Sequence, residues 1–101
     1  MKFLYLLTAS LMAIAAPAHA QCGGQGIILF SAHWCPACRA TEQFLANYDI
    51  EYIRYEVSGN QQVQQFMREQ YGTIAIPVIV VDGIPKVGYS AAWLREALCL
   101  R

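Results

Sequence analysis

Residues 27–38 read Ile-Ile-Leu-Phe-Ser-Ala-His-Trp-Cys-Pro-Ala-Cys, an apolar run followed by two cysteines three positions apart. The continuous apolar run at 26–30 has the length of a strand and predicts a strand covered on both faces. Pro36 is tolerated in the first turn of a helix, so a helix is expected to begin beside the cysteines. At a helix N-terminus, free N–H groups and the helix dipole favour a thiolate over a thiol. The stretch therefore predicts that Cys35 is a nucleophile and that Cys38, one turn later, can displace what Cys35 captures.

The same two cysteines allow two other interpretations. A Cys-x-x-Cys pair is half of many zinc sites, but Cys22, Cys99 and His33 lack the spacing of a second ligand pair, so no metal is expected. A purely structural disulfide between cysteines three apart would constrain little chain entropy, because the stabilisation grows with loop length. Reversible dithiol chemistry remains the main hypothesis.

The N-terminal residues predict a signal peptide, 1–20, ahead of a single domain, 21–101. An apolar stretch at 3–16 follows a basic second residue, and Ala18-His19-Ala20 places small residues where a signal peptidase reads them. The alternative is an uncleaved anchor, although about 14 apolar residues are fewer than the roughly 20 that span a bilayer. We therefore expect export, with the bacterial periplasm as the location and no stable membrane insertion once the leader is removed.

Charge and size limit the partners and the core. The chain has seven basic and seven acidic side chains, and only Lys2 lies in the leader, so the exported domain would carry a net charge of −1. Nothing in this balance attracts nucleic acid.

A domain of this size has a small core, which a covalent crosslink would help to stabilise. If Cys35 and Cys38 form the redox couple, Cys22 and Cys99 remain for a structural disulfide; the alternative is two ordinary cysteines, with Cys99 buried on an apolar helix face.

Periodicity along the rest of the domain predicts an α/β fold with the order β-α-β-α-β-β-α. A strand, a crossover helix and a second strand imply a parallel pair, and a closing hairpin adds an antiparallel edge to give a mixed four-stranded sheet. No repeat or linker divides the chain, and we expect a monomer. The expected elements are a strand at 26–30; a helix at 36–47; a strand at 50–57 with a slip near Arg54; a helix opened by a capping box of Ser58 and Gln61 and ending at Gly72; strands at 78–81 and 84–87 joined by Asp82-Gly83; and a helix at 91–100 capped by Ser90.

Three segments together resemble the thioredoxin superfamily, and the short element order resembles its glutaredoxin branch. The segments are Trp34-Cys35-Pro36-Ala37-Cys38, Thr73-Ile74-Ala75-Ile76-Pro77, and Asp82-Gly83 followed by Gly88-Tyr89. The resemblance covers nearly all of residues 26–100. It implies a thioredoxin-like fold in which a cis Ile76-Pro77 bond lies beside Cys35; from sequence alone, a trans proline marking strand entry is the alternative.

The resemblance also implies roles for individual residues. The backbone of Ile76 would pair with an extended substrate, which gives affinity without much sequence preference. The substrate-binding surface would comprise Trp34, Pro36, Ile76, Pro77, Gly88 and Tyr89, although Trp34 and Tyr89 are also compatible with ordinary packing. His33 and Arg39 are either cations that assist the thiolate or solvated surface residues.

Departures from the family pattern are informative. Glutaredoxins usually carry a lysine where this chain has Ala32, and a Gly-Gly pair and acidic residues where it has Val87-Gly88 and Ser90-Ala91. Most of the charge recognition of glutathione is therefore missing, and protein thiols and disulfides are the expected partners, with glutathione as a further substrate. Thioredoxins also bury an acidic residue in the strand before the cysteines. Because 27–30 contains none, the sequence names no proton acceptor for Cys38.

The sequence thus predicts an exported thiol-disulfide oxidoreductase that works through Cys35 and Cys38 and needs no cofactor. The alternatives are a non-catalytic peptide-binding module whose cysteine pair is a redox switch, and a zinc-binding protein.

Overall fold

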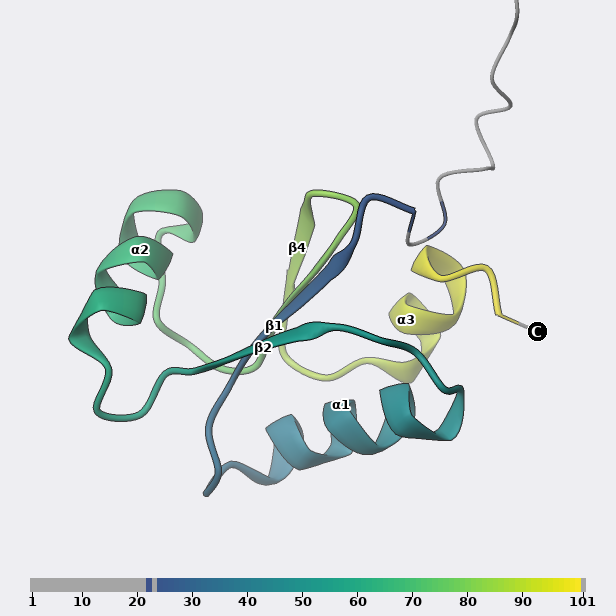
Figure 1. Ribbon diagram of the computed structural model, residues 1–101, viewed down its shortest axis with the longest axis horizontal. Helices are drawn as coiled ribbons and strands as arrows, with labels where there is room; N and C mark the ends of the chain where they lie inside the picture. Colours follow the sequence, from purple (N-terminus) through teal and green to yellow (C-terminus); the bar gives the residue numbers. More distant parts are fainter. Residues whose placement is uncertain (1–21, 23, 101) are drawn as a thin grey trace, which may run out of the picture.

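A computed structural model describes residues 22 and 24–100 and places four strands and three helices in them (Figure 1). The strands form one sheet in the order β2-β1-β3-β4, with β1 parallel to β2 and antiparallel to β3. The expected α/β fold with a mixed four-stranded sheet is confirmed. The expected signal peptide, 1–20, lies outside the described residues. In chain order the elements are β1 (Ile27–Ser31), α1 (Pro36–Asn47), β2 (Ile53–Glu56), α2 (Gln61–Tyr71), β3 (Val78–Val81), β4 (Ile84–Val87) and α3 (Ala91–Ala97).

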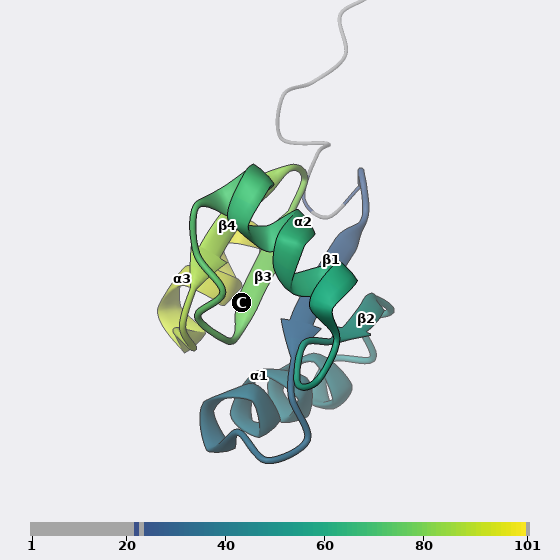
Figure 2. The ribbon, with the colours of Figure 1, turned by 90° about the vertical axis from the view of Figure 1, so that its left-hand side faces the viewer.

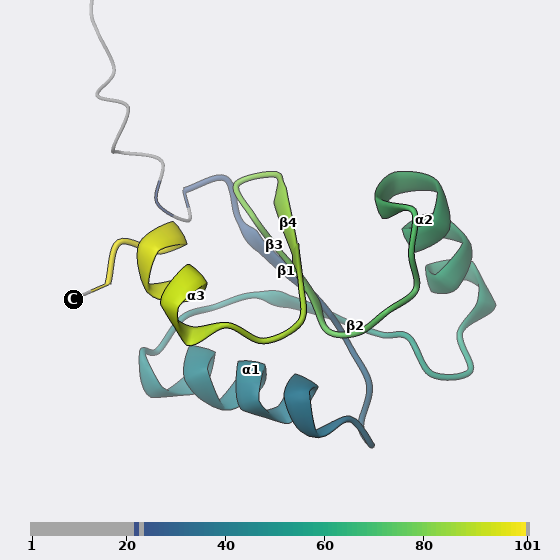
Figure 3. The same ribbon diagram turned by 180° about the vertical axis from the view of Figure 1, so that it is seen from behind.

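Helices cover both faces of the sheet, which explains the continuous apolar run in β1. Helices α1 and α3 lie on one side and α2 on the other, in front of the sheet in Figure 2 and opposite α1 and α3 in Figure 3. Since side chains alternate along a strand, Ile27 and Leu29 pack with α1 and α3, whereas Phe30 packs in the cluster on the α2 side. By the same alternation Ser31, at the end of β1, belongs to the α1 side.

The β3–β4 connection is the tight hairpin that Asp82-Gly83 predicts. Both residues have positive φ, 52° and 82°, as the two central positions of a type I′ turn require. The turn aligns Val81 with Ile84 and Val78 with Val87.

Among the described residues, no helix is both long and apolar enough to cross a membrane.

The first helix ends in a backbone motif that the sequence did not reveal. Asp49 adopts a left-handed φ of 55°, its N–H donates to Ala46 O, and the N–H of Ile50 donates to Leu45 O at 2.9 Å. This is the hydrogen-bond pattern of a Schellman motif, with aspartate at the position that glycine usually takes. The expected start of the second strand at Ile50 is therefore wrong, because Ile50 belongs to the helix cap and β2 begins at Ile53.

The last helix ends in the same way, earlier than expected. Cys99 has a φ of 56°, its N–H donates to Glu96 O, and the N–H of Leu100 donates to Arg95 O at 2.8 Å. The prediction that the helix reaches residue 100 is wrong, because the left-handed residue ends α3 at Ala97. This turn presents Cys99 to Cys22, and the two form a disulfide with a Cα–Cα distance of 5.8 Å.

Two of three cap predictions agree with the structure. Ser90 caps α3 by accepting from the N–H of Trp93, and Gly72 ends α2 with a φ of 72°. The capping box at Ser58 is wrong, because the N-cap of α2 is Asn60, whose Oδ1 accepts from the N–H of Val63 at 3.2 Å. Asparagine and serine cap helices about equally well, so the side chain alone does not distinguish the two positions.

Candidate active site

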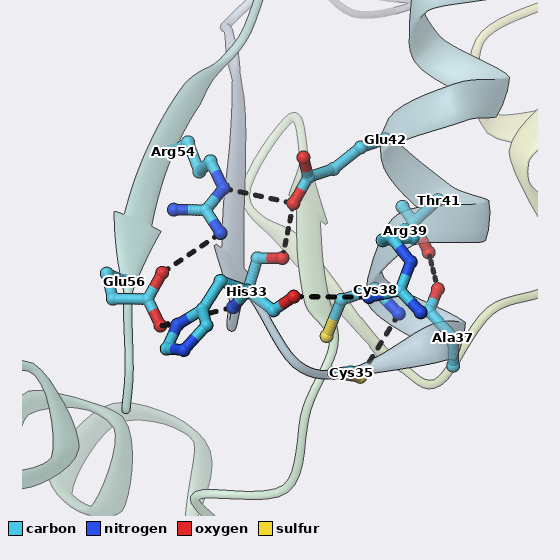
Figure 4. A network of polar contacts seen from close by, with 10 residues as sticks. His33, Cys35, Ala37, Cys38, Arg39, Thr41, Glu42, Arg54 and Glu56 are labelled. Carbon is cyan, nitrogen blue, oxygen red and sulfur yellow. Dashed lines mark hydrogen bonds and ion pairs between the residues drawn. The ribbon is translucent and has the colours of Figure 1, made fainter. Parts of the chain in front are cut away.

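Cys35 occupies the N-cap of α1, as the position of Pro36 at the start of the helix predicts. Its backbone is extended, and its Sγ accepts a hydrogen bond from the N–H of Cys38 at 3.1 Å (Figure 4). The first N–H groups of a helix have no intrahelical partners, and the helix dipole is positive at this end. The Cys38 N–H is one of these groups, and it donates to the Cys35 sulfur. The arrangement stabilises negative charge on Cys35, which is the property that a nucleophilic cysteine needs.

Cys38 lies one helical turn further into the protein and has a different environment. Its side chain is fully buried, and both Cys35 and Cys38 are free thiols. Burial raises the pKa of Cys38 to about 11, and the hydrogen bond with Cys35 adds to the rise, while hydrogen bonds with the Ala32 backbone and the Ser31 side chain lower it. Cys38 is therefore held as a thiol that must lose its proton before it can attack a disulfide.

The loop before β3 brings the second predicted segment to the cysteines. The Ile76-Pro77 bond is cis, and Ile76 packs against the buried cluster of Ala32, Cys35 and Cys38. The N–H of Gly88 donates to Pro77 O at 2.7 Å, which joins the end of the hairpin to this loop. The structure thus places Ile76 against the two cysteines and links Gly88 to the adjoining Pro77 by a backbone hydrogen bond.

The remaining predicted substrate-binding residues lie around this centre with different degrees of contact. Trp34 precedes Cys35 and leaves 57% of its surface exposed, and Pro36 is also exposed. Tyr89 is partly exposed, but its ring packs edge-on against Phe44 of α1 at a centroid distance of 6.4 Å. Trp34 is therefore accessible to a partner, and Tyr89, which packs on Phe44, also leaves 41% of its surface exposed.

A polar network on the α1 side of the sheet is the part of the site that sequence reasoning missed. Ser31 Oγ donates to Glu42 Oε2 at 2.5 Å, and Arg54 Nε donates to the same oxygen at 3.0 Å. Arg54 also pairs with Glu56 at 3.0 Å, and Figure 4 shows Glu42 reaching from α1 toward the two residues of β2. The available signal was the spacing of Cys38 and Glu42, which are four residues apart and so share one helix face.

The two cationic candidates of the sequence both join this network at its exposed end. His33 Nδ1 lies 3.2 Å from Glu56 Oε2, and Arg39 donates to the carbonyl of His33 at 3.1 Å. Desolvation of Glu56 is outweighed by its hydrogen bonds with His33 and Arg54, so its pKa lies below the ordinary value. His33 and Arg39 thus have partners other than the cysteine sulfurs.

The structure gives no support to the zinc alternative. Within residues 22 and 24–100, no group of three or more histidine, cysteine, aspartate or glutamate side chains could hold a metal ion. Cys22 and Cys99, two of the three further ligands weighed from the sequence, are joined in a disulfide.

An apolar pocket lies away from the cysteines, on the α2 side of the sheet. Its volume is about 260 Å³, and none of its lining residues was predicted to bind a substrate. The lining residues are Ile28, Phe30, Tyr55, Gln62, Val63 and Phe66.

Comparison with known proteins agrees with this geometry. The family model for glutaredoxin matches residues 27–84. A glutaredoxin-like 8.6 kDa protein from the rubredoxin operon of Clostridium pasteurianum, itself uncharacterized, is 29% identical over 72 residues, which are 71% of this chain and 96% of that protein.

Solved structures share the fold at lower identity. A mutant of the thioredoxin-like protein BC3987 is 21% identical with a TM-score of 0.70, over 76% of this chain and 99% of that one. The glutaredoxin-like NrdH-redoxin of Escherichia coli is 18% identical with a TM-score of 0.62, over 69% of this chain and 91% of its own. The matched family segment covers more than half of the chain and contains both cysteines and the Ile76-Pro77 loop. The chain therefore belongs to the glutaredoxin family and has the thioredoxin-like fold of that family.

Proposed function

We propose that this protein is an exported thiol-disulfide oxidoreductase that cycles Cys35 and Cys38 between a dithiol and a disulfide. The observation that carries the proposal is the pairing of a helix-capping Cys35, whose sulfur accepts the N–H of Cys38, with a buried Cys38 one turn away. An N-terminal thiolate and a protonated neighbour are the two states that stepwise disulfide exchange requires.

The reaction proceeds in two exchanges. The Cys35 thiolate attacks one sulfur of a substrate disulfide, forms a mixed disulfide, and releases the other substrate sulfur as a thiolate. Cys38 then loses its proton and attacks Cys35 Sγ, which forms the Cys35–Cys38 disulfide and releases the second substrate thiolate. The substrate disulfide is reduced by two electrons and the protein dithiol is oxidised by two; the reverse sequence oxidises a substrate dithiol.

Protein disulfides suit this site better than glutathione. The position at which related glutaredoxins carry a lysine is the buried Ala32, which offers no cation to a glutathione carboxylate. The Ile76-Pro77 loop instead presents backbone groups of the kind that pair with an extended chain, and the exposed indole of Trp34 adds apolar contact. The Escherichia coli NrdH-redoxin, a glutaredoxin-like protein of the same fold, has a thioredoxin-like activity profile.

Export to an oxidising compartment fits the second pair of cysteines. The disulfide between Cys22 and Cys99 closes almost the whole domain, and such bonds persist outside the cytosol. Together with the signal peptide predicted at 1–20, it supports the proposal of a periplasmic location.

Reduction of insulin by dithiothreitol tests the proposed activity. The native protein should accelerate it in catalytic amounts and Cys35→Ser should not. Glu69→Gln, a change on the exposed surface of α2, serves as the control and should keep the native rate. The proposal is wrong if Cys35→Ser retains the native rate, which would leave a peptide-binding module with a redox switch as the better description.

A further inference from the structure

Cys38 must lose its proton during the second exchange, and the two cysteines and the Ile76-Pro77 loop offer no group that accepts it. The side chain is 0% exposed, so bulk water does not reach its sulfur, yet the thiol must become a thiolate to resolve the mixed disulfide. The strand residues 27–30 contain no acidic side chain to receive the proton. A buried proton donor of this kind needs an acceptor within hydrogen-bonding reach.

Ser31 and Glu42 supply a connected pair of groups on the same side of the sheet. Ser31 is itself 0% exposed, ends β1 on the α1 side, and donates its hydroxyl proton to Glu42 at 2.5 Å. Glu42 follows Cys38 by one helical turn, so both side chains project from the same face of α1. The Ser31 side chain also lowers the pKa of the Cys38 thiol, which places its hydroxyl beside that sulfur.

We propose that Ser31 and Glu42 form the path by which the proton leaves Cys38 when it resolves the mixed disulfide. This inference rests on the proposed function. The Ser31 hydroxyl accepts the proton of Cys38 as it passes its own proton to the Glu42 carboxylate, so Ser31 ends unchanged, Glu42 becomes a carboxylic acid, and Cys38 becomes the thiolate that attacks Cys35 Sγ. The released substrate thiolate leaves with the bond electrons, and Glu42 returns its proton to solvent.

The surroundings of Glu42 connect it to polar side chains and to solvent. Arg54 of β2 donates to the same Glu42 oxygen that Ser31 contacts. Desolvation raises the pKa of Tyr52, and the charge of Glu42 adds to that rise. Glu42 also lines an open surface pocket of about 350 Å³ with Arg39 and Tyr52, which gives the proton an exit to solvent.

Cys38 packs with Ala32, Cys35 and Ile76, and the Ser31 side chain contributes to its pKa. Glu42 follows Cys38 by one turn of α1, and the buried Thr41 between them donates its hydroxyl to Ala37 O. Beyond Glu42 the charged groups are Arg54 and Glu56 of β2, with His33 on Glu56. The Ser31 hydroxyl therefore leads from the side of Cys38 to the Glu42 carboxylate.

A two-phase thiol reaction separates this inference from the proposed function. When the full-length protein, with Cys35 and Cys38 reduced and the Cys22–Cys99 disulfide intact, reacts with excess dithiobis-nitrobenzoate, Cys35 releases the first coloured thiolate and Cys38 releases the second by resolving the mixed disulfide. The first phase reports the nucleophile, and the second reports the deprotonation of Cys38. Absence of a second phase in the native protein would refute the proposed function itself.

Glu42→Gln should slow the second phase about 100-fold near pH 7, at the low end of what a general base contributes, and leave the first phase unchanged. With hydroxide as the remaining base, its second phase should rise about tenfold per pH unit, more steeply than in the native protein. Ser31→Ala should behave in the same way, and Glu42→Asp should restore part of the rate. Should Ser31→Ala fail to fold, Glu42→Gln and Glu42→Asp decide the question.

A control variant excludes a merely structural effect. Glu69→Gln makes the same chemical change on the exposed surface of α2 and should match the native protein. The inference is overturned if Glu42→Gln leaves the second phase unchanged, or if it slows the second phase equally at every pH.

Discussion

Removal of the Cys22–Cys99 disulfide should destabilise this small domain strongly. The two cysteines are separated by 77 positions in the chain. A crosslink across a loop of that size lowers the entropy of the unfolded chain by an amount worth about 4.5 kcal/mol, and native bridges deliver about 2 to 5 kcal/mol. Because Cys99 is exposed and Cys22 is only half-buried, truncation to alanine removes little apolar burial. Alanine also meets the same left-handed backbone at position 99 as cysteine does, so the comparison isolates the crosslink.

The assay is urea unfolding of the oxidised full-length protein and of Cys22→Ala/Cys99→Ala. We expect the free energy of unfolding to fall by about 2 to 4.5 kcal/mol in the double variant, and by as much in each single variant, because either change breaks the bond. Reduction of the Cys22–Cys99 disulfide in the native protein should lower its free energy of unfolding to that of the double variant. A difference below about 0.5 kcal/mol between native and double variant would refute the reasoning, since that is the size of an ordinary surface substitution.

Three further predictions test the caps, the hairpin and the buried thiol. Asn60→Ala should lower the free energy of unfolding by about 1 kcal/mol and Ser58→Ala should not, as urea titration would show; equal losses would contradict the cap assignment. Gly83→Ala should cost about 1 kcal/mol in the same titration through its φ of 82° alone, because an added Cβ meets nothing within 4 Å; an unchanged stability would contradict the turn. The pKa of Cys38 rises from 9.0 to about 11 on folding, so the reduced unfolded chain loses this proton first; stability should fall as the pH rises from 9.0 toward 11, and Cys38→Ala should lack that extra slope in unfolding measured against pH.

Sequence patterns specified the elements wherever one residue type carries the local signal. Asp82-Gly83 defines its turn because both positions need positive φ, and Gly72 ends its helix for the same reason. The ends of α1 and α3 could not be placed in this way, because Asp49 and Cys99 take the left-handed conformation without being glycine. At those sites the surrounding fold, and at Cys99 also the bond to Cys22, determines the backbone.

The active site likewise has one part that the local sequence predicts and one part that depends on tertiary packing. The position of Cys35 at the N-cap follows from Pro36 and the local pattern alone. The contact between Ser31 and Glu42 depends on how α1 packs across β1, and no local pattern specifies that distance. The strand before the cysteines holds no carboxylate, because in this protein the carboxylate near Ser31 comes from α1.

Trapping of the mixed disulfide tests the central claim most directly. The Cys38→Ser variant, incubated with disulfide-bonded insulin, should form a covalent adduct, because without Cys38 the insulin chain captured on Cys35 is no longer displaced. Mass spectrometry should assign the adduct to Cys35, and dithiothreitol should reduce it. Cys35→Ser, treated in the same way, should form none. No adduct on Cys38→Ser, or an equal adduct on Cys35→Ser, would contradict the assignment of Cys35 as the nucleophile and Cys38 as the resolving thiol.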